Sequence, residues 1–376
     1  MQNEHKRKLQ EKNDIRRQIF KSTKAERVNW KRVKKEIATT KEEKLLAERE
    51  AAKNKVEEED VDLRRPYSLS IALPGQFLNL AQSSELRTYM AGQIARAATL
   101  YCVEEIVIYD ESNRMTQDAI DVYYRGDWKG ATHPSEANYE SCFHLAKILE
   151  YLECPQYLRK ELFPIHRALK YAGLLNPLDA HHHLKADNKT FPFREGVVLK
   201  KLSKEGRGPI CNIGLDKLFQ IDVEVNLPPG TRVTVEVKNF GKDNKLYRGS
   251  LVGPSKVRKE TGQYWGYTVR LVPSLQDALD RTKYDVVAGV SPRGKSPSQL
   301  ECCILNNPKV LLVFGGVSGV DTAVESDELA EWKRAEDAFD VLLATTAANG
   351  SHSERVEENV LAMLAQVQCR LEQLAV

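Results

Sequence analysis

Apolar residues recur with two different periods near the start of the well-patterned region. Residues 67–73 alternate apolar and polar positions and stop at Pro74-Gly75, which predicts a strand. Ser83 or Ser84 then caps a predicted helix in which Leu86, Met90, Ile94 and Ala97 recur every three to four residues. Residues 105–110 form a second short apolar strand. A strand, a helix and a strand in this order predict a parallel pair in a sheet covered by helices.

The next segment changes from polar to helical. Residues 111–137 are polar and are interpreted as a loop. Helices are predicted near residues 138–152 and 156–171, with a break at Pro155 and an end around Asn176-Pro177.

A run of short, evenly spaced strands follows. Turns at residues 228–230 and 253–254 separate some of them. Five or six short antiparallel strands in such a stretch predict a small barrel, and an OB-like barrel fits the strand number. The predicted strands are residues 196–199, 211–214, 219–225, 231–237, 247–252 and 264–271.

The α/β pattern resumes after the barrel. Residues 285–290, 309–314 and 340–345 are buried-type strands, and a closing helix over residues 353–374 carries one apolar face. The barrel is therefore an insertion into one α/β domain. We divide the chain into an arm at 1–65, the first part of the α/β domain at 66–185, the barrel at 186–272 and the second part of the α/β domain at 273–376.

Composition indicates the cellular compartment and argues against a membrane span and a metal site. The chain has 376 residues, no apolar run long enough for a transmembrane helix and a polar N-terminus, so we expect neither a membrane span nor a secretory signal. Seven cysteines without a Cys-x-x-Cys pair indicate free thiols in a reducing, intracellular compartment. The run His181–His183 has no ligand partner at metal spacing, so we interpret it as a solvated loop and expect no metal site.

Charge is unevenly distributed although the net charge is only +3. Residues 1–35 hold 13 lysines and arginines against four acidic residues, a net of +9, which leaves −6 for the remainder. The cluster at residues 30–35 is of a kind used in nuclear import or nucleic-acid contact. A charged, partly helical arm that only adds solubility is the alternative.

The barrel combines basic and aromatic residues. This combination favours single-stranded nucleic acid, bound by charge and by stacking of bases on aromatic rings. The alternative is an ordinary barrel with lysine-covered edges and core aromatics. The basic positions are Lys238, Lys242, Lys245, Arg248, Lys256, Arg258 and Lys259, and the aromatic positions are Tyr247, Tyr264, Trp265 and Tyr267.

Three loops rich in small residues follow the last three predicted α/β strands. They are residues 291–294, 315–319 and 345–351. Ligands of open α/β sheets bind beyond the carboxyl ends of the strands, and glycine lets backbone groups approach a ligand closely. We therefore expect the ligand site there.

The first of these loops overlaps a Walker A pattern. Residues 289–296 read G-V-S-P-R-G-K-S and follow a predicted strand, which taken alone indicates a P-loop NTPase. Residues 297–305 are too few for the usual long helix before Asn306-Asn307-Pro308, and the next strand ends in Phe-Gly-Gly without a magnesium-binding Asp. The NTPase is kept as a lesser alternative.

Six stretches together resemble one family. They are RPYSLSIALP at 65–74, ELRTYMAGQIARA at 85–97, LECPQYLRK at 152–160, YAGLLNPL at 171–178, YWGYTVRL at 264–271 and VFGG at 313–316. They are similar to the SPOUT-class RNA methyltransferases, in particular to the archaeal and eukaryotic subgroup with a barrel insertion. The likeness covers residues 66–375 and leaves the basic arm outside.

The resemblance implies a fold and a site. The fold would be a parallel sheet whose C-terminal part is threaded into a trefoil knot, assembled as a homodimer. The three loops would bind S-adenosylmethionine, and Arg293 and Arg355 would supply positive charge for catalysis. Two departures from the family pattern are Pro292, where Glu is usual, and His352, where Arg is usual. The implied cofactor residues are Ser291, Arg293, Gly294, Phe314, Gly315, Gly316, Thr345, Thr346, Asn349, Gly350 and Ser351.

The resemblance also implies an activity. It is methylation of RNA, at N3 of a uridine in large-subunit ribosomal RNA, with Lys238, Lys242, Lys245, Arg248, Tyr264 and Trp265 as RNA contacts. Location in the nucleus, nucleolus and cytoplasm, and association with spindle, centrosome or kinetochore proteins, are implied as well. The alternative, motivated by residues 292 and 352, is a non-catalytic adaptor that binds RNA or spindle and ribosome-assembly partners.

Overall fold

The computed structural model describes residues 62–131, 137, 139–201, 207–238, 240, 245–300, 307–327, 330, 332–345 and 354–374. Residues Leu63–Val376 form one compact unit. The basic arm predicted at the N-terminus lies, up to residue 61, outside the described residues.

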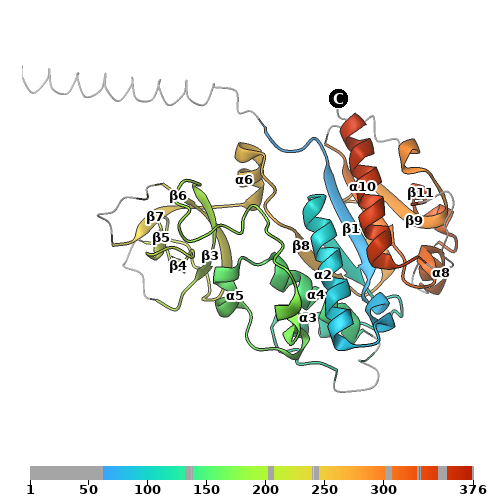
Figure 1. The fold of residues 1–376 in the computed structure, drawn as a ribbon, viewed down its shortest axis with the longest axis horizontal. Helices are drawn as coiled ribbons and strands as arrows, with labels where there is room; N and C mark the ends of the chain where they lie inside the picture. Colours follow the sequence, from blue (N-terminus) through green and yellow to red (C-terminus); the bar gives the residue numbers. More distant parts are fainter. Residues whose placement is uncertain are drawn as a thin grey trace, which may run out of the picture. The chain divides into compact units, whose positions relative to one another are not determined.

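A six-stranded parallel sheet is the centre of this unit (Figure 1). The strand order is β11-β9-β10-β1-β2-β8, so two strands from before the barrel lie between strands from after it. The barrel is thus an insertion into one sheet, as predicted. The strands are β1 (Ser68–Pro74), β2 (Glu105–Tyr109), β8 (Thr268–Val272), β9 (Val286–Lys295), β10 (Lys309–Phe314) and β11 (Val341–Leu343).

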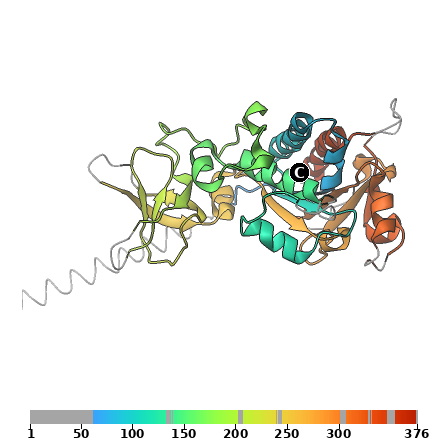
Figure 2. The same cartoon turned by 90° about the horizontal axis from the view of Figure 1, so that it is seen from below.

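Helices cover both faces of the sheet. On one face, α2 (Ser84–Leu100), α4 (Glu140–Glu153) and α10 (Val356–Leu374) share a core that includes Ile94, Leu149 and Leu364. Figure 2 shows α2, in blue, and α10, in red, side by side. On the other face, α7 (Leu275–Ala278), α8 (Gly319–Ser326) and α9 (Ala335–Ala338) pack on a second core. Parallel strands need cover on both sides, and here both sides are buried.

The predicted first helix begins where its capping residue places it. The Ser83 hydroxyl accepts a hydrogen bond from the Leu86 amide at 3.2 Å, which satisfies one of the free N–H groups of the first turn. The helix continues to Leu100, three residues beyond the last apolar position used in the prediction.

A closed five-stranded barrel stands between β2 and β8 in the sequence. Its strand order is β3-β4-β5-β7-β6; β5 and β7 are parallel, and the other described pairs are antiparallel. Aliphatic residues, Cys211 and two aromatic residues, Phe219 and Tyr247, fill it. The predicted barrel is confirmed with five strands, namely β3 (Phe193–Val198), β4 (Ile210–Asn212), β5 (Phe219–Ile221), β6 (Arg232–Val237) and β7 (Tyr247–Val252).

The prediction that residues 264–271 form a sixth barrel strand is wrong. Residues 268–272 are β8, which pairs with β2 in the parallel sheet. The hydroxyls of Tyr264 and Tyr267 donate to the carbonyls of Val103 and Leu149, at 2.7 and 3.0 Å, and so bind the segment to the sheet and to α4. Alternation predicts a strand but does not say which sheet it joins.

Two helical segments also differ from the prediction. The polar stretch 111–137 contains a helix, α3 (Gln117–Tyr124), which is capped by Thr116. The buried side of this helix consists of Ile120 and Tyr123. The helix predicted at 156–171 is shorter, because α5 (Gln156–Leu162) gives way to two 3-10 turns, η3 (Arg167–Leu169) and η4 (Ala172–Leu174). The remaining elements are η1 (Gly75–Leu80), α6 (Pro254–Thr261) and η5 (Pro297–Gln299).

Among the described residues, each helix is too short or too polar to cross a lipid bilayer.

Candidate cofactor and RNA site

All six strands are parallel, so their carboxyl ends lie along one edge of the sheet. The loops predicted at residues 315–319 and 345–351 begin there, whereas residues 291–294, also predicted as a loop, form the last part of strand β9. The ends of β9 and β10 bring Ser291, Arg293 and Gly294, and Phe314, Gly315 and Gly316, to neighbouring strands, and Thr345 follows the end of β11. The described part of the predicted cofactor set is therefore assembled at one edge.

Glycine is required at positions 294 and 315 because the backbone passes very close to its neighbours there. A β-carbon at Gly315 would lie 2.0 Å from the Val320 nitrogen, and one at Gly294 would lie 2.4 Å from the Leu343 carbonyl carbon. Both contacts are with backbone atoms, which cannot move aside as a flexible side chain could. The end of β9 and the loop after β10 are therefore held tightly against the adjoining elements.

The loop after β2 supplies a carboxylate that the sequence analysis did not identify. The Glu111 Oε1 accepts a hydrogen bond from the Gly316 amide at 2.6 Å. Burial, and secondarily the nearby Asp110 carboxylate, raise the pKa of Glu111, while the Gly316 amide lowers it. Glu111 follows a predicted strand directly, and that position at a strand end was the available signal.

Asp110, one residue earlier, has a different task. Its Oδ2 accepts from the amides of Arg114 and Met115 at 2.9 and 2.8 Å, and its Oδ1 accepts from the Ser112 amide and hydroxyl. The Asp110 side chain is fully buried. Its carboxylate therefore shapes the loop after β2.

A second carboxylate that the prediction missed binds the last part of strand β9. Asp321, on α8, accepts from the Ser291 hydroxyl at 2.8 Å and forms an ion pair with Arg293. The Arg293 side chain is still 63% exposed, so its guanidinium faces solvent at the edge of the sheet. Hydrogen bonding to Asp321 raises the pKa of Arg293.

The remaining described residues of the predicted site are Phe314 at the end of β10, Thr345 after β11 and Arg355 before α10. The Phe314 carbonyl accepts from the Tyr109 hydroxyl at 2.8 Å, and the Thr345 hydroxyl donates to Asn359. Arg355 stands one residue before α10, is exposed, and lies 3.9 Å from Glu358. Thr346, Asn349, Gly350, Ser351 and the variant position His352 lie outside the described residues.

The Walker-like residues form a strand and not a phosphate loop. Residues 286–295 are one strand, β9, in which Gly289 pairs with Val313 and Lys295 with Leu343. The next element is the three-residue η5. A P-loop requires a loop that wraps the phosphates and opens a helix. The NTPase alternative is therefore wrong.

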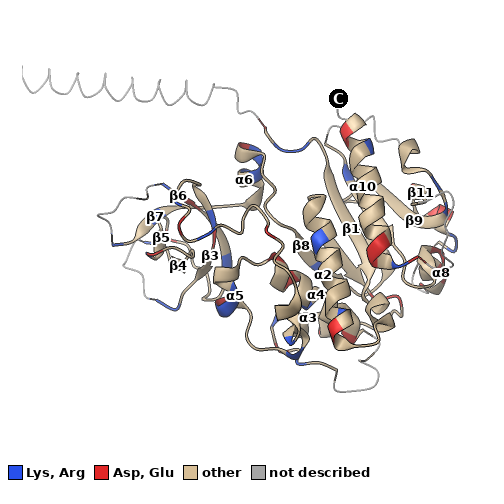
Figure 3. Cartoon of the chain, viewed as in Figure 1, with Lys and Arg blue, Asp and Glu red and all other residues tan. Residues whose placement is uncertain are grey.

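Four basic residues were predicted to contact RNA, and the structure describes three of them. Lys238, Lys245 and Arg248 are exposed on the barrel, and Lys238 also lies 3.0 Å from Asp222. Lys242 lies outside the described residues. Figure 3 shows further basic residues on α5 and α6.

The predicted stacking of RNA bases on barrel aromatics is not supported. Tyr264 and Trp265 are only 8% and 3% exposed, and Tyr247 and Tyr267 are also buried. Tyr247 belongs to the barrel core, and the other three lie where the chain returns from the barrel to the sheet. They are core and joint residues, because their rings and polar groups are already engaged by the protein.

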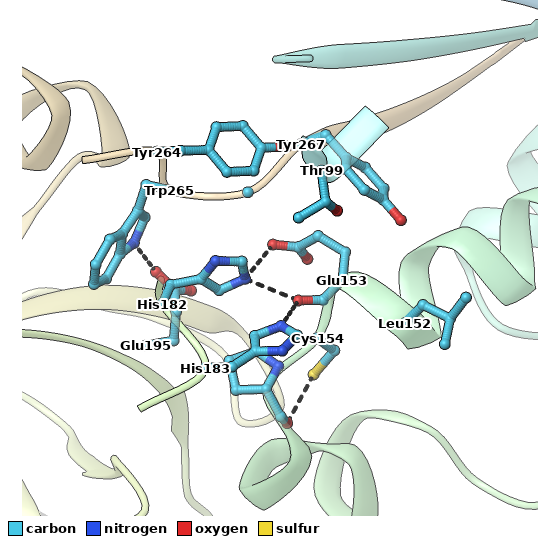
Figure 4. A network of polar contacts seen from close by, with 12 residues as sticks. Thr99, Leu152, Glu153, Cys154, His182, His183, Glu195, Tyr264, Trp265 and Tyr267 are labelled. Carbon is cyan, nitrogen blue, oxygen red and sulfur yellow. Dashed lines mark hydrogen bonds and ion pairs between the residues drawn. The ribbon is translucent and has the colours of Figure 1, made fainter. Parts of the chain in front are cut away.

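Trp265 belongs to a buried polar network between barrel and sheet (Figure 4). Its indole N–H donates to Glu195 at 2.6 Å, and Glu195 also accepts from Arg232 at 2.7 Å. Arg232 in turn donates to Glu153 at the end of α4, and Glu153 pairs with His182 at 2.9 Å. The network joins five segments of the chain, around residues 153, 182, 195, 232 and 265.

The same network corrects the interpretation of the histidine run. His182 is fully buried and His183 partly so, and the ring Nε2 of each contacts the Glu153 carbonyl. Only His181 is exposed, so the run is not a solvated loop. Within the described residues, no cluster of three or more His, Cys, Asp or Glu has the arrangement of a metal site.

The chain matches one family model over most of its length. Residues 68–367 match the family described as "Putative RNA methyltransferase". This match, together with the parallel sheet and the barrel, shows that the chain belongs to that family of RNA methyltransferases.

Relatives with curated names agree. "Putative methyltransferase spot-1" of Caenorhabditis elegans is 66% identical, over 100% of this chain and 99% of the relative. A human protein named "28S rRNA (uridine-N(3))-methyltransferase" is 42% identical, over 87% of this chain and 85% of the relative. A Drosophila melanogaster protein of the same name is 40% identical, over 92% and 73%.

Proposed function

We propose that the protein transfers a methyl group from S-adenosylmethionine to N3 of a uridine in large-subunit ribosomal RNA. The family supports RNA methylation, and the names of the human and fly relatives support this base and this RNA. The observation that carries the proposal is the pair of tightly packed glycines, Gly294 near the end of β9 and Gly315 directly after β10, at the carboxyl edge of the sheet.

The residues at this edge fit the proposed cofactor. Backbone groups of Ser291, Gly294, Phe314, Gly315, Gly316 and Thr345 line the strand ends, with Thr346, Asn349, Gly350 and Ser351 following in the sequence. Close-packed glycines present N–H and C=O groups without side chains in the way. The sulfonium of the bound cofactor supplies an electrophilic methyl group.

Arg293 is proposed to act on the RNA. Its guanidinium is 63% exposed yet fixed at one end by Asp321, which limits its conformational freedom. A positioned positive charge favours the anionic form of a uracil ring or holds an adjacent phosphate. Arg355, exposed before α10, is the second candidate for this role.

The barrel is proposed to hold the rest of the RNA. Lys238, Lys245 and Arg248 are exposed on it, and charge alone, without stacking, provides salt-sensitive and sequence-independent affinity. The basic residues of the arm would add to this term. Recognition of one uridine then depends on the edge of the sheet.

Two further proposals rest on the family resemblance alone. The protein is proposed to act as a homodimer, which sedimentation of the full chain tests. It is also proposed to locate to the nucleus, nucleolus and cytoplasm, with spindle, centrosome or kinetochore association, which imaging of a tagged chain through the cell cycle tests.

Calorimetry with S-adenosylhomocysteine tests the proposed function. The wild type should bind, and Gly316→Arg should not, because the arginine side chain would fill the loop after β10 and displace the Glu111 carboxylate from the Gly316 amide. Gly173→Ala is the matched control, since a β-carbon at Gly173 meets no atom within 4 Å. Absence of binding by the wild type would contradict the enzyme and favour the adaptor alternative.

A further inference from the structure

Methylation of a uridine at N3 requires a group that removes a proton. N3 of neutral uracil carries a hydrogen, and its pKa lies well above neutrality. A positioned base within reach of that hydrogen typically accelerates such a step by about 10²–10⁴. The loops predicted from the sequence offered arginines but no base.

Glu111 is placed where such a base is needed. It follows β2 at the carboxyl edge of the sheet, and its side chain is neither fully buried nor fully exposed. A β-carbon at Gly316 would lie 2.5 and 2.7 Å from its two carboxylate oxygens, so both oxygens border the glycine loop. Oε1 accepts the Gly316 amide, and Oε2 accepts no hydrogen bond from the described residues.

Two other carboxylates at this edge of the sheet, Asp110 and Asp321, already have hydrogen-bond or ion-pair partners. Asp110 uses both oxygens to hold its own loop, including the amides of Ser112 and Met115. Asp321 accepts a hydrogen bond from the Ser291 hydroxyl and forms an ion pair with Arg293, so both of its oxygens already have partners. Glu111 is left with an oxygen available to a substrate.

The surroundings of Glu111 favour proton uptake. Burial and the Asp110 carboxylate raise the pKa of Glu111, which brings it closer to the working range of a general base. The other titratable groups that couple to it are the phenol of Tyr109 and the thiol of Cys142. Burial raises the pKa of both of these groups, so they stay neutral and add no competing charge near neutrality.

We propose that Glu111 is a catalytic residue, the general base that takes the N3 proton of the target uridine. The inference rests on the proposed function. The N3–H bond breaks and its proton goes to Glu111, the freed electron pair forms the N3–carbon bond, and the carbon–sulfur bond breaks with its electrons staying on sulfur. Charge and atoms balance, and the protonated carboxyl returns its proton to water.

Glu111→Gln separates this role from a structural one. The amide keeps an oxygen that can accept the Gly316 N–H, so the loop should stay in place, but it cannot take a proton. We expect methylation of the RNA substrate at neutral pH to fall by about 10²-fold or more. The loss should shrink as the pH rises and uridine ionises without help, while binding of S-adenosylhomocysteine stays within about twofold of wild type.

Asp118→Asn, an exposed carboxylate on α3, is the matched control and should keep the wild-type rate and pH profile. A Glu111→Gln variant with the wild-type rate and pH profile would overturn the proposal. So would a variant that loses S-adenosylhomocysteine binding along with activity, because Glu111 would then only hold the loop. A wild type that neither binds S-adenosylhomocysteine nor methylates RNA would instead overturn the proposed function.

Discussion

The guanidinium of Arg232, on barrel strand β6, donates to both carboxylate oxygens of Glu153, at the end of α4. The two distances are 2.5 and 3.0 Å, and the Arg232 Nε donates to Glu195 at 2.7 Å. The Glu153 side chain is 8% exposed, and its partners are Arg232 from the barrel and His182 from the segment before β3. This pair couples the orientation of the barrel to the sheet that carries the candidate active site.

Arg232→Leu should destabilise the protein strongly. It leaves the buried Glu153 carboxylate without its main counter-charge, and removal of one partner of a buried pair costs about 3–5 kcal/mol. Urea unfolding followed by circular dichroism measures this loss in the free energy of unfolding. Arg125→Leu is the control: its pair with Asp127 is exposed and should contribute at most about 1 kcal/mol. Equal effects of the two substitutions would contradict a coupling role for Arg232.

Stability should fall with acid in two steps. Burial lowers the pKa of His144 and of His183 from 6.5 to about 4, so unfolding takes up protons once the pH is below 6.5. Burial alone would raise the pKa of Glu153. Arg232 and His182 outweigh this effect and lower the pKa from 4.5 to about 2. Its contribution is complete above pH 4.5 and is lost as the pH falls toward 2, on the order of 3 kcal/mol in all.

Unfolding free energies measured from about pH 7 to about pH 3 test this order. His144→Phe should flatten the step below pH 6.5, and Glu153→Gln should remove the lower one. A stability that stays constant between pH 6.5 and pH 4 would contradict the burial of neutral histidines.

Gly315→Ala should abolish S-adenosylhomocysteine binding. The new β-carbon would lie 2.0 Å from the Val320 nitrogen, and relief of that contact requires the loop after β10 to move. Calorimetry compares this variant with Gly173→Ala, whose β-carbon meets open space and which should bind like wild type. Unchanged binding by Gly315→Ala would place the cofactor elsewhere.

Lys245→Ala combined with Arg248→Ala should weaken RNA binding. Both side chains are exposed on the barrel, and each lost phosphate contact lowers the slope of log affinity against log salt by about 0.7 for a single strand. Filter binding at several salt concentrations measures affinity and slope together. Lys129→Ala, which removes an exposed charge from the α/β part, should change neither.

Trp265→Phe tests whether Trp265 links the barrel to the sheet or binds RNA. Its indole donates to the buried Glu195, so the substitution should lower the free energy of unfolding by about 1–3 kcal/mol, the penalty for losing a buried hydrogen bond. RNA affinity of the folded variant should stay at the wild-type value. A selective loss of RNA affinity at unchanged stability would restore the stacking role predicted from the sequence.

The sequence was sufficient for the order of the elements. Strands β1, β2, β9 and β10 begin within one residue of the predicted starts, because a short apolar run has few alternatives, but β9 continues to Lys295, five residues beyond its predicted end. The cap, predicted as Ser83 or Ser84 and found at Ser83, and the barrel insertion were predicted for similar local reasons. Ligand loops at strand ends follow from the parallel sheet.

The sequence patterns could not predict which distant side chains contact one another. Arg232 and Glu153 are 79 residues apart in the sequence, and nothing local distinguishes them from surface charges. The aromatics at 264–267 and the histidine at 182 were misread for the same reason, because hydrophobic and charge patterns report burial only when the neighbouring elements are known. Glu111 and Asp321 acquire their roles only once the strand ends are side by side.

Mapping of N3-methyluridine in large-subunit ribosomal RNA, in cells with and without this protein, tests the central claim most directly. The account predicts that one such methyl group disappears when the protein is absent, returns with the wild type, and fails to return with Gly316→Arg or Glu111→Gln. An unchanged methylation map in cells lacking the protein would contradict it.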